Sequence, residues 1–90
     1  MYPGQIKYVE PEYPVILRRH GVGGKGIFRL TINQRTGLVD EVKVLKSTGV
    51  VLLNEVAAKA MLQWQFQPGS VKELVVPFEF EVHGFSRILH

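Results

Sequence analysis

Three stretches of the chain alternate apolar and polar residues, which is the pattern of β-strands with one buried face. The first two are separated only by a short turn that ends in Gly37, and so short a connection predicts an antiparallel hairpin. In the third stretch, Phe78 and Phe80 share the apolar face. The predicted strands cover residues 24–33, 38–46 and 73–82.

A helical periodicity lies between the second and third predicted strands. Apolar residues recur there at spacings of three and four, which places them along one side of a helix that ends before Pro68. A shorter helix is expected over residues 14–20, because proline suits a first helical turn and Gly21 suits the position after a helix end. The longer helix carries Leu53, Val56, Ala57, Ala60, Met61 and Trp64 on its apolar side.

The order helix, strand, strand, helix, strand predicts an α+β fold. We expect a three-stranded antiparallel sheet with two helices packed on one face. The whole chain, residues 1–90, is expected to be one domain with its core at about 11–82. Residues 1–10 are expected to be a flexible segment in which 5–8 favour a short extended stretch, and the tail at 83–90 has no assigned structure.

Composition narrows the function classes. The chain has 90 residues, 46% of them hydrophobic, no cysteine and a net charge of +3, which argues against disorder, disulfide frameworks and thiol chemistry. No apolar run is long enough to span a bilayer, and the start does not resemble a signal peptide. Met1 fits a start codon placed before an excised domain, so that a longer natural chain would extend upstream.

No catalytic, cofactor or metal site is expected. The histidines His20, His83 and His90 lack the spacing of metal ligands, and Gly26 follows Lys25 where a phosphate loop needs serine or threonine. A core of this size offers no cleft that would perturb the carboxylates. We therefore expect a binding domain and not an enzyme.

Pro77 lies inside the third predicted strand and indicates a sheet edge. Proline has no amide hydrogen, so its nitrogen should point away from the neighbouring strand. Because peptide groups alternate in direction, Val75, Glu79 and Glu81 would then also expose theirs. Such an edge can accept a strand from a partner. The competing interpretation is that Pro77 and the two glutamates only guard the edge against aggregation.

Aromatic and basic residues leave one alternative open. Trp64 and Phe66 are interpreted as core residues, although exposed aromatic rings would also suit base stacking in a small nucleic-acid-binding module. The basic side chains are interpreted as solvated surface groups rather than as a binding patch. These are Arg18, Arg19, Lys25, Arg29 and Lys43.

Several short motifs occur together in a defined order. They are Tyr13-Pro14, Ser47-Thr48-Gly49, Leu53 with Ala57 four residues later, Trp64-Gln65-Phe66-Gln67-Pro68, and Val76-Pro77-Phe78-Glu79-Phe80. In these residues, over about 11–82, the chain resembles the C-terminal domain of the TonB family of energy transducers.

The resemblance implies a periplasmic domain that is anchored to the inner membrane through an upstream helix. It implies capture of the TonB box of outer-membrane transporters by strand addition, driven by the ExbB–ExbD motor and used for siderophore or vitamin import. A well-studied member of the family has glutamines in this region, whereas this chain has Glu10 and Glu12, and an ionised carboxylate only accepts hydrogen bonds. The implied contact residues are Glu10, Pro11, Glu12, Tyr13 and Pro14, followed by Leu74, Val75, Val76, Pro77, Phe78, Glu79 and Phe80.

Two further possibilities remain within this family. The same domain occurs in relatives whose partners are not transporters. A homodimer is the other possibility, with two copies pairing their last strands. Alternatively, within a monomer, residues 5–8 would cover the edge of the last strand.

Overall fold

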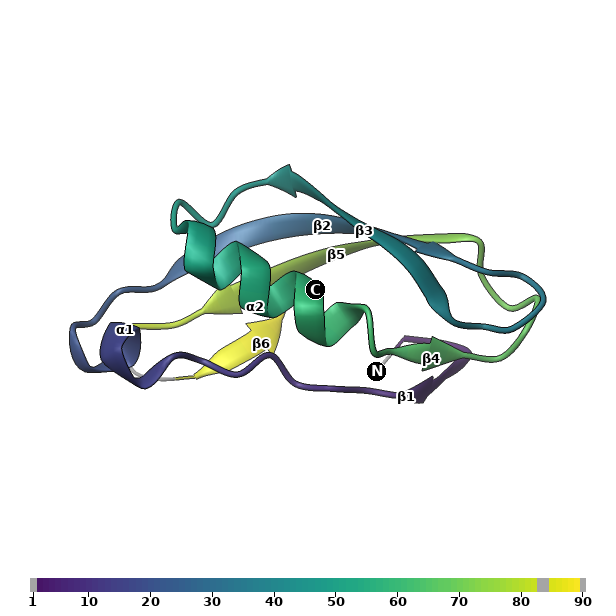
Figure 1. Ribbon diagram of the computed structural model, residues 1–90, viewed down its shortest axis with the longest axis horizontal. Coiled ribbons are helices and arrows are strands. Elements are labelled where there is room, and N and C mark those ends of the chain that lie inside the picture. Colours follow the sequence, from purple (N-terminus) through teal and green to yellow (C-terminus); the bar gives the residue numbers. More distant parts are fainter. Residues whose placement is uncertain (1, 83–84, 90) are drawn as a thin grey trace.

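The structure is a computed structural model that describes residues 2–82 and 85–89. The molecule is elongated and measures 42 × 21 × 20 Å (Figure 1). Its elements, in chain order, are β1 (Gln5–Lys7), α1 (Val15–Arg19), β2 (Gly24–Ile32), β3 (Val39–Lys46), α2 (Val51–Met61), β4 (Gln65–Phe66), β5 (Glu73–Phe80) and β6 (Ser86–Ile88).

The main sheet is antiparallel and has four strands in the order β3-β2-β5-β6. The three predicted strands are confirmed as β2, β3 and β5, and α+β is the correct class. The prediction of three strands was wrong because the C-terminal tail contributes β6. A strand of three residues is too short to produce a recognisable alternation in the sequence.

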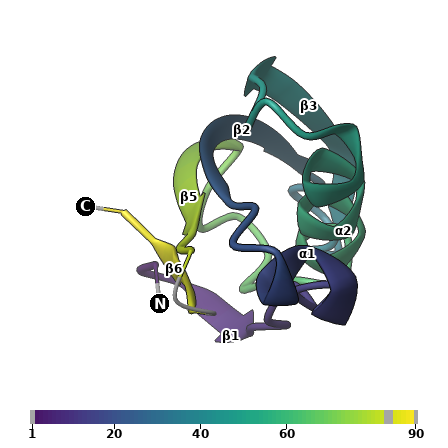
Figure 2. The same ribbon diagram turned by 90° about the vertical axis from the view of Figure 1, so that its left-hand side faces the viewer.

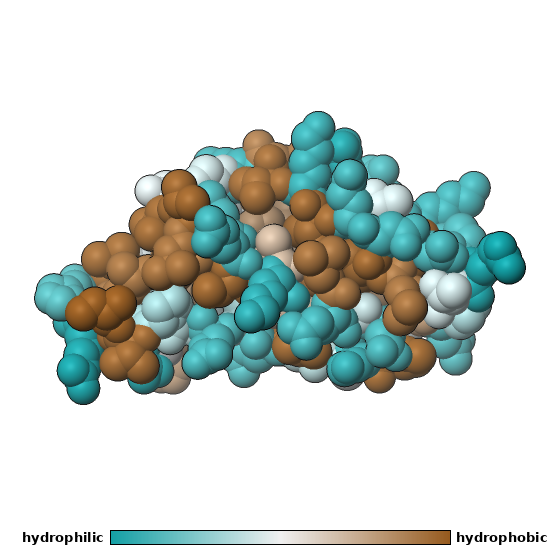
Figure 3. Space-filling model, in the orientation of Figure 1, coloured by the Kyte–Doolittle hydropathy of each residue, from teal (hydrophilic) through white to brown (hydrophobic). Residues whose placement is uncertain are grey.

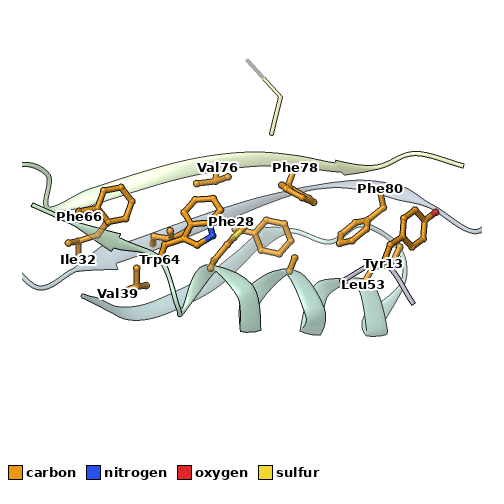
Figure 4. Packing of buried hydrophobic residues seen from close by; sticks show 13 residues of the cluster. Tyr13, Phe28, Ile32, Val39, Leu53, Trp64, Phe66, Val76, Phe78 and Phe80 are labelled. Atoms are coloured by element: carbon orange, nitrogen blue, oxygen red, sulfur yellow. The ribbon is translucent and has the colours of Figure 1, made fainter. Parts of the chain in front are cut away.

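The core lies between the sheet and α2, which packs along one sheet face (Figures 2 and 4). Its largest side chains are fully buried, and removing any of them would leave a cavity that costs several kcal/mol, about 3–5 for an aromatic residue. Of the expected core residues, Val44 is 39% exposed because β3 is the outermost strand. The buried residues of sheet and helix include Phe28, Leu30, Val76, Phe78, Phe80, Leu53, Ala57, Ala60 and Met61.

Only one of the two helices covers the sheet, which corrects the second part of the fold prediction. Helix α1 has five residues and buries none of them, because its apolar residues are consecutive and form no stripe. Val15 and Ile16 are 52% and 60% exposed. Apolar groups therefore gather on the surface near α1 and the start of α2, where Val51 and Leu52 are also exposed (Figure 3).

The structure of the segment before α2 explains the Ser47-Thr48-Gly49 motif. The backbone N–H and the hydroxyl of buried Thr48 both donate to Asn54 Oδ1, at 2.9 and 2.7 Å. Asn54 Nδ2 donates in turn to Ser47 Oγ at 2.8 Å. Gly49 has a φ of +92°, a conformation that residues with a Cβ rarely adopt. These contacts fix the end of β3 against the first turn of α2.

The N-terminal residues, expected to be flexible, are part of the fold. Strand β1 pairs with β4, so the prediction of an extended stretch there is confirmed, whereas its role as a cover for the last long strand was wrong. The indole N–H of Trp64 donates to Val9 O at 2.8 Å, and the Tyr8 ring lies 5.1 Å from the Trp64 ring. Trp64 and Phe66 are fully buried, which confirms core packing and excludes base stacking by these rings.

Candidate functional site

The outer edge of β5 is partly covered, which corrects the prediction of an open edge. Strand β6 runs antiparallel to β5 and places Ile88 opposite Phe78 and Arg87 opposite Glu79. The Leu89 N–H donates to Pro77 O at 2.8 Å, beyond the end of β6. Strand β5 therefore lies between two strands of its own chain, β2 and β6.

The predicted direction of the peptide groups is nevertheless correct. The Pro77 carbonyl accepts from Leu89, and the Glu81 N–H donates to Phe85 O at 2.6 Å, so both groups point away from β2. A strand opposite Pro77 finds an acceptor but no donor, because proline has no amide hydrogen. The pairing of β6 ends at this point. Among the described residues, no strand pairs with the outer side of β5 at Leu74 and Val75.

The side chains of β5 divide between its two faces. Val76, Phe78 and Phe80 belong to the core, and their peptide groups point towards β2, so neither their side chains nor their backbones are available to a partner. Pro77 and Glu79 are half-buried on the opposite face, where Val75 is 48% exposed. Of the predicted contact residues on this strand, the odd-numbered ones face the solvent side of the sheet.

Strand β6 is held to β5 by an ion-pair cluster. Arg87 Nη2 lies 3.2 Å from Glu79 Oε1 and 3.2 Å from Glu81 Oε1. Lys25 Nζ lies 3.8 Å from the other carboxylate oxygen of Glu79. The Glu79 side chain is only 15% exposed and that of Glu81 31%, whereas Arg87 is 58% exposed. The two carboxylates thus form a partly buried receptor for one cation from the neighbouring strand.

The second predicted contact region, residues 10–14, is anchored by Tyr13. Its hydroxyl donates to Val22 O at 2.6 Å, and its ring meets Phe80 edge-on at 5.2 Å. Burial raises the pKa of Tyr13, while the positive charge of Arg18 acts in the opposite direction. Pro11 is also buried, which leaves the two carboxylates of this segment, Glu10 and Glu12, facing solvent.

The structure brings the two predicted regions together through the C-terminal segment. A hollow of about 360 Å³ lies between residues 10–13 and Phe85 and Ser86. Ser86 Oγ donates to Glu10 Oε1 at 3.3 Å. The residues from Phe85 to Leu89 were missed as part of the site. Because Ile88 and Leu89 are adjacent and both apolar, residues 85–89 lack the alternation of a strand, and the sequence did not indicate that they form one.

Metal ligation has no support in the part of the chain that the structure covers. Within residues 2–82 and 85–89, no three His, Asp or Glu side chains cluster as metal ligands would. A ring nitrogen of His20 lies 2.8 Å from Ile16 O, at the end of α1. His83 and His90 lie outside the described residues. Over the same range, no helix has the length and hydrophobicity to cross a membrane.

Comparison with known proteins identifies the fold. The model of the family described as Gram-negative bacterial TonB protein C-terminal matches residues 9–83. The chain belongs to this family. It is 26% identical to protein TonB of Vibrio cholerae over 84% of the chain and 33% of that protein. It is 31% identical to protein tonB2 of Pseudomonas aeruginosa over 89% of the chain and 32% of that protein.

This TonB C-terminal domain therefore spans about a third of the length of the curated relatives that it matches. The match begins just before the Glu10–Pro14 segment and includes all of β5. All of β6 lies beyond the matched residues. The covered edge is thus formed by a segment of the family domain and a strand outside the family match.

Proposed function

We propose that this TonB C-terminal domain is a non-catalytic peptide-capture module. It takes an extended segment of a partner, such as the TonB box of an outer-membrane transporter, as an added strand on β5. The visiting strand replaces β6. The observation that carries this proposal is β6 itself, a three-residue strand seated on the outward peptide groups of β5 between the two implied contact regions.

Hydrogen-bond energies support an exchange of one strand for another. Each backbone hydrogen bond contributes about 0.5–1.5 kcal/mol net, while association of two molecules costs about 4–15 kcal/mol. Strand β6 is tethered and avoids most of that cost, but it is short. A longer peptide gains the outward peptide groups of Val75, which β6 leaves without a strand partner. The free energies of the two pairings, with β6 and with a peptide, are therefore close to each other, which suits a contact that must form and release.

The proposed role of the full-length protein follows from family membership. The domain would lie in the periplasm at the end of a chain anchored in the inner membrane. The ExbB–ExbD motor would act on that anchor, and the captured TonB box would transmit force to the transporter. Uptake of siderophores or vitamins is the proposed outcome of this coupling.

Nuclear magnetic resonance of the ¹⁵N-labelled chain tests strand exchange. A synthetic TonB-box peptide is titrated into the protein, and backbone amides are followed. We expect Arg87 and Leu89 to shift towards unfolded values, while the amides of Glu79 and Glu81 gain protection from exchange. Shifts confined to β3, with β6 unchanged, would place the peptide on the opposite edge and contradict the proposal.

A matched pair of variants separates backbone from side-chain effects. Glu79→Pro removes an amide directed at β6, whereas Glu79→Gln keeps it. We expect the proline variant to weaken peptide binding at least about tenfold, because one hydrogen bond is lost and the ring obstructs pairing. The glutamine variant should retain binding of a peptide with no cation at that position. The melting temperature of both should stay close to the parent, since the bonds between β5 and β2 are untouched.

A further inference from the structure

Strand β6 also indicates which peptides the edge prefers. Resting on the proposed function, we infer that the peptide that replaces β6 carries a lysine or arginine opposite Glu79 and an apolar residue opposite Phe78. Glu79 and Glu81 would bind the basic side chain. These glutamates thereby become specificity-determining residues of the captured peptide.

The first support is the charge that β6 leaves behind. Arg87 contacts both Glu79 and Glu81 at 3.2 Å, and the Glu79 side chain is 85% buried in this arrangement. When β6 is displaced, Lys25 is the remaining ion-pair partner of Glu79, at 3.8 Å and with a side chain that is 67% exposed. Glu81 then has no ion-pair partner among the described residues, and the two carboxylates, two residues apart, repel each other with less compensation. A cation on the incoming strand restores the lost ion pairs.

The second support is the sign of the charges along the edge. Glu10 and Glu12 line the neighbouring hollow, in which Arg18 is the lining cation. Glu79 and Glu81 line a second hollow at the C-terminal end of β5, together with Lys25. Because Phe80 pairs with Ser86, carboxylates of both hollows gather beside the start of β6, although the chain as a whole carries a net charge of +3. A basic peptide is favoured by this local arrangement through complementarity.

The third support concerns the apolar position. Ile88 is partly buried and packs against the core cluster while it lies opposite Phe78. Leu89 follows opposite Pro77, where its N–H is bonded. Read from the N-terminus of the visiting strand, the preferred order is therefore a basic residue followed by an apolar one. This order follows from the residues of β6 and the strand register alone.

The test uses the full chain with the substitution Arg87→Ala, which loosens β6 without altering β5. The probes are the peptide acetyl-Phe-Ser-Arg-Ile-Leu-amide and its counterpart with citrulline, a neutral isostere, in place of arginine. Affinities are measured by NMR titration at low salt. We expect the arginine peptide to bind about fivefold more tightly, because it bridges two partly buried carboxylates. Added salt should reduce the difference.

The double substitution Glu79→Gln, Glu81→Gln in the same background is the matched control. It should remove the preference for arginine and leave the citrulline peptide nearly unaffected. Equal affinities of the two peptides at β5, before this substitution, would overturn the charge preference and leave strand capture intact. Absence of binding by both peptides at the β5 edge would overturn strand capture together with the preference.

Discussion

The two outer strands of the main sheet, β3 and β6, solve the problem of an exposed edge in different ways. Strand β3 has eight residues, and its pairing with β2 is interrupted by two irregularities in register. Charged side chains such as Asp40 and Lys43 line it. Strand β6 has three residues, pairs in regular register and carries one arginine. Bulges and charges guard the edge at β3, whereas a short strand covers the edge of β5.

The difference between the two edges indicates where a partner strand could pair with the sheet. An irregular register on β3 presents its outward peptide groups unevenly, so an added strand would lose hydrogen bonds. The outward groups of β5 are regular, and the strand that occupies them contributes little to the core beyond Ile88. Under the proposed function, the edge that β6 covers is therefore the one at which a partner strand would enter.

Proline substitutions should give the largest contrast between the two edges. The Pro77 carbonyl points away from β2, and peptide groups alternate in direction along each strand. Following this alternation across the paired strands places the Lys43 amide opposite Arg29 on β2. Lys43→Pro should lower the free energy of unfolding by about 2–3 kcal/mol, because it removes a ladder bond and orphans a carbonyl. Arg87→Pro should cost less than about 1 kcal/mol, since the bonds of β6 roughly offset its ordering entropy.

Urea denaturation followed by circular dichroism measures both effects. Lys43→Ala and Arg87→Ala are the controls for loss of the side chains. If Arg87→Pro destabilised the protein as much as Lys43→Pro, β6 would be an integral strand, and the distinction between the edges would fail.

Tyr13 anchors residues 10–14, which lie beside β6 and are not part of it. Tyr13→Phe should lower the free energy of unfolding by about 1 kcal/mol, because the hydroxyl bond to Val22 O is lost. Burial raises the pKa of Tyr13 above its unfolded value of 10.0, so folding favours the neutral phenol. Its contribution is complete below pH 10 and is lost as pH rises through the folded pKa.

The pH dependence has a matched control in the variant. The parent should lose stability more steeply than Tyr13→Phe above pH 10 in urea titrations. Part of the loss should remain in the variant, because burial also raises the pKa values of Tyr2 and Tyr8. Identical profiles would mean that Tyr13 ionises freely in the folded state.

Ser86→Ala should produce the smallest effect. The bond from Ser86 Oγ to Glu10 is exposed and 3.3 Å long, so its loss should change stability by less than about 0.5 kcal/mol. Hydrogen exchange at the Leu89 amide should stay within about twofold of the parent, whereas Arg87→Ala should accelerate it. Fast exchange in Ser86→Ala but not in Arg87→Ala would show that the contact with the N-terminal segment, and not the ion-pair cluster, holds β6.

The sequence predicted those parts of the fold in which local pattern and burial coincide. Strands β2 and β5 alternate cleanly because each buries one face, and α2 shows its stripe because it packs along the sheet. The prediction that α1 also packs on the sheet was wrong, because a helix of one or two turns is too short to show an apolar stripe in the sequence. In the candidate site, the direction of the Pro77 peptide groups was predictable, whereas the identity of its neighbour was not.

What the sequence by itself determined is which residues form the long strands and which way the peptide groups of β5 point, because both depend on alternation within one segment. Only the tertiary structure decided that the tail returns beside β5 and that Arg87 meets Glu79 and Glu81. Such a pairing depends on where the chain lies after it leaves the sheet. For a segment of three residues, that position is set by long-range contacts and not by local preference.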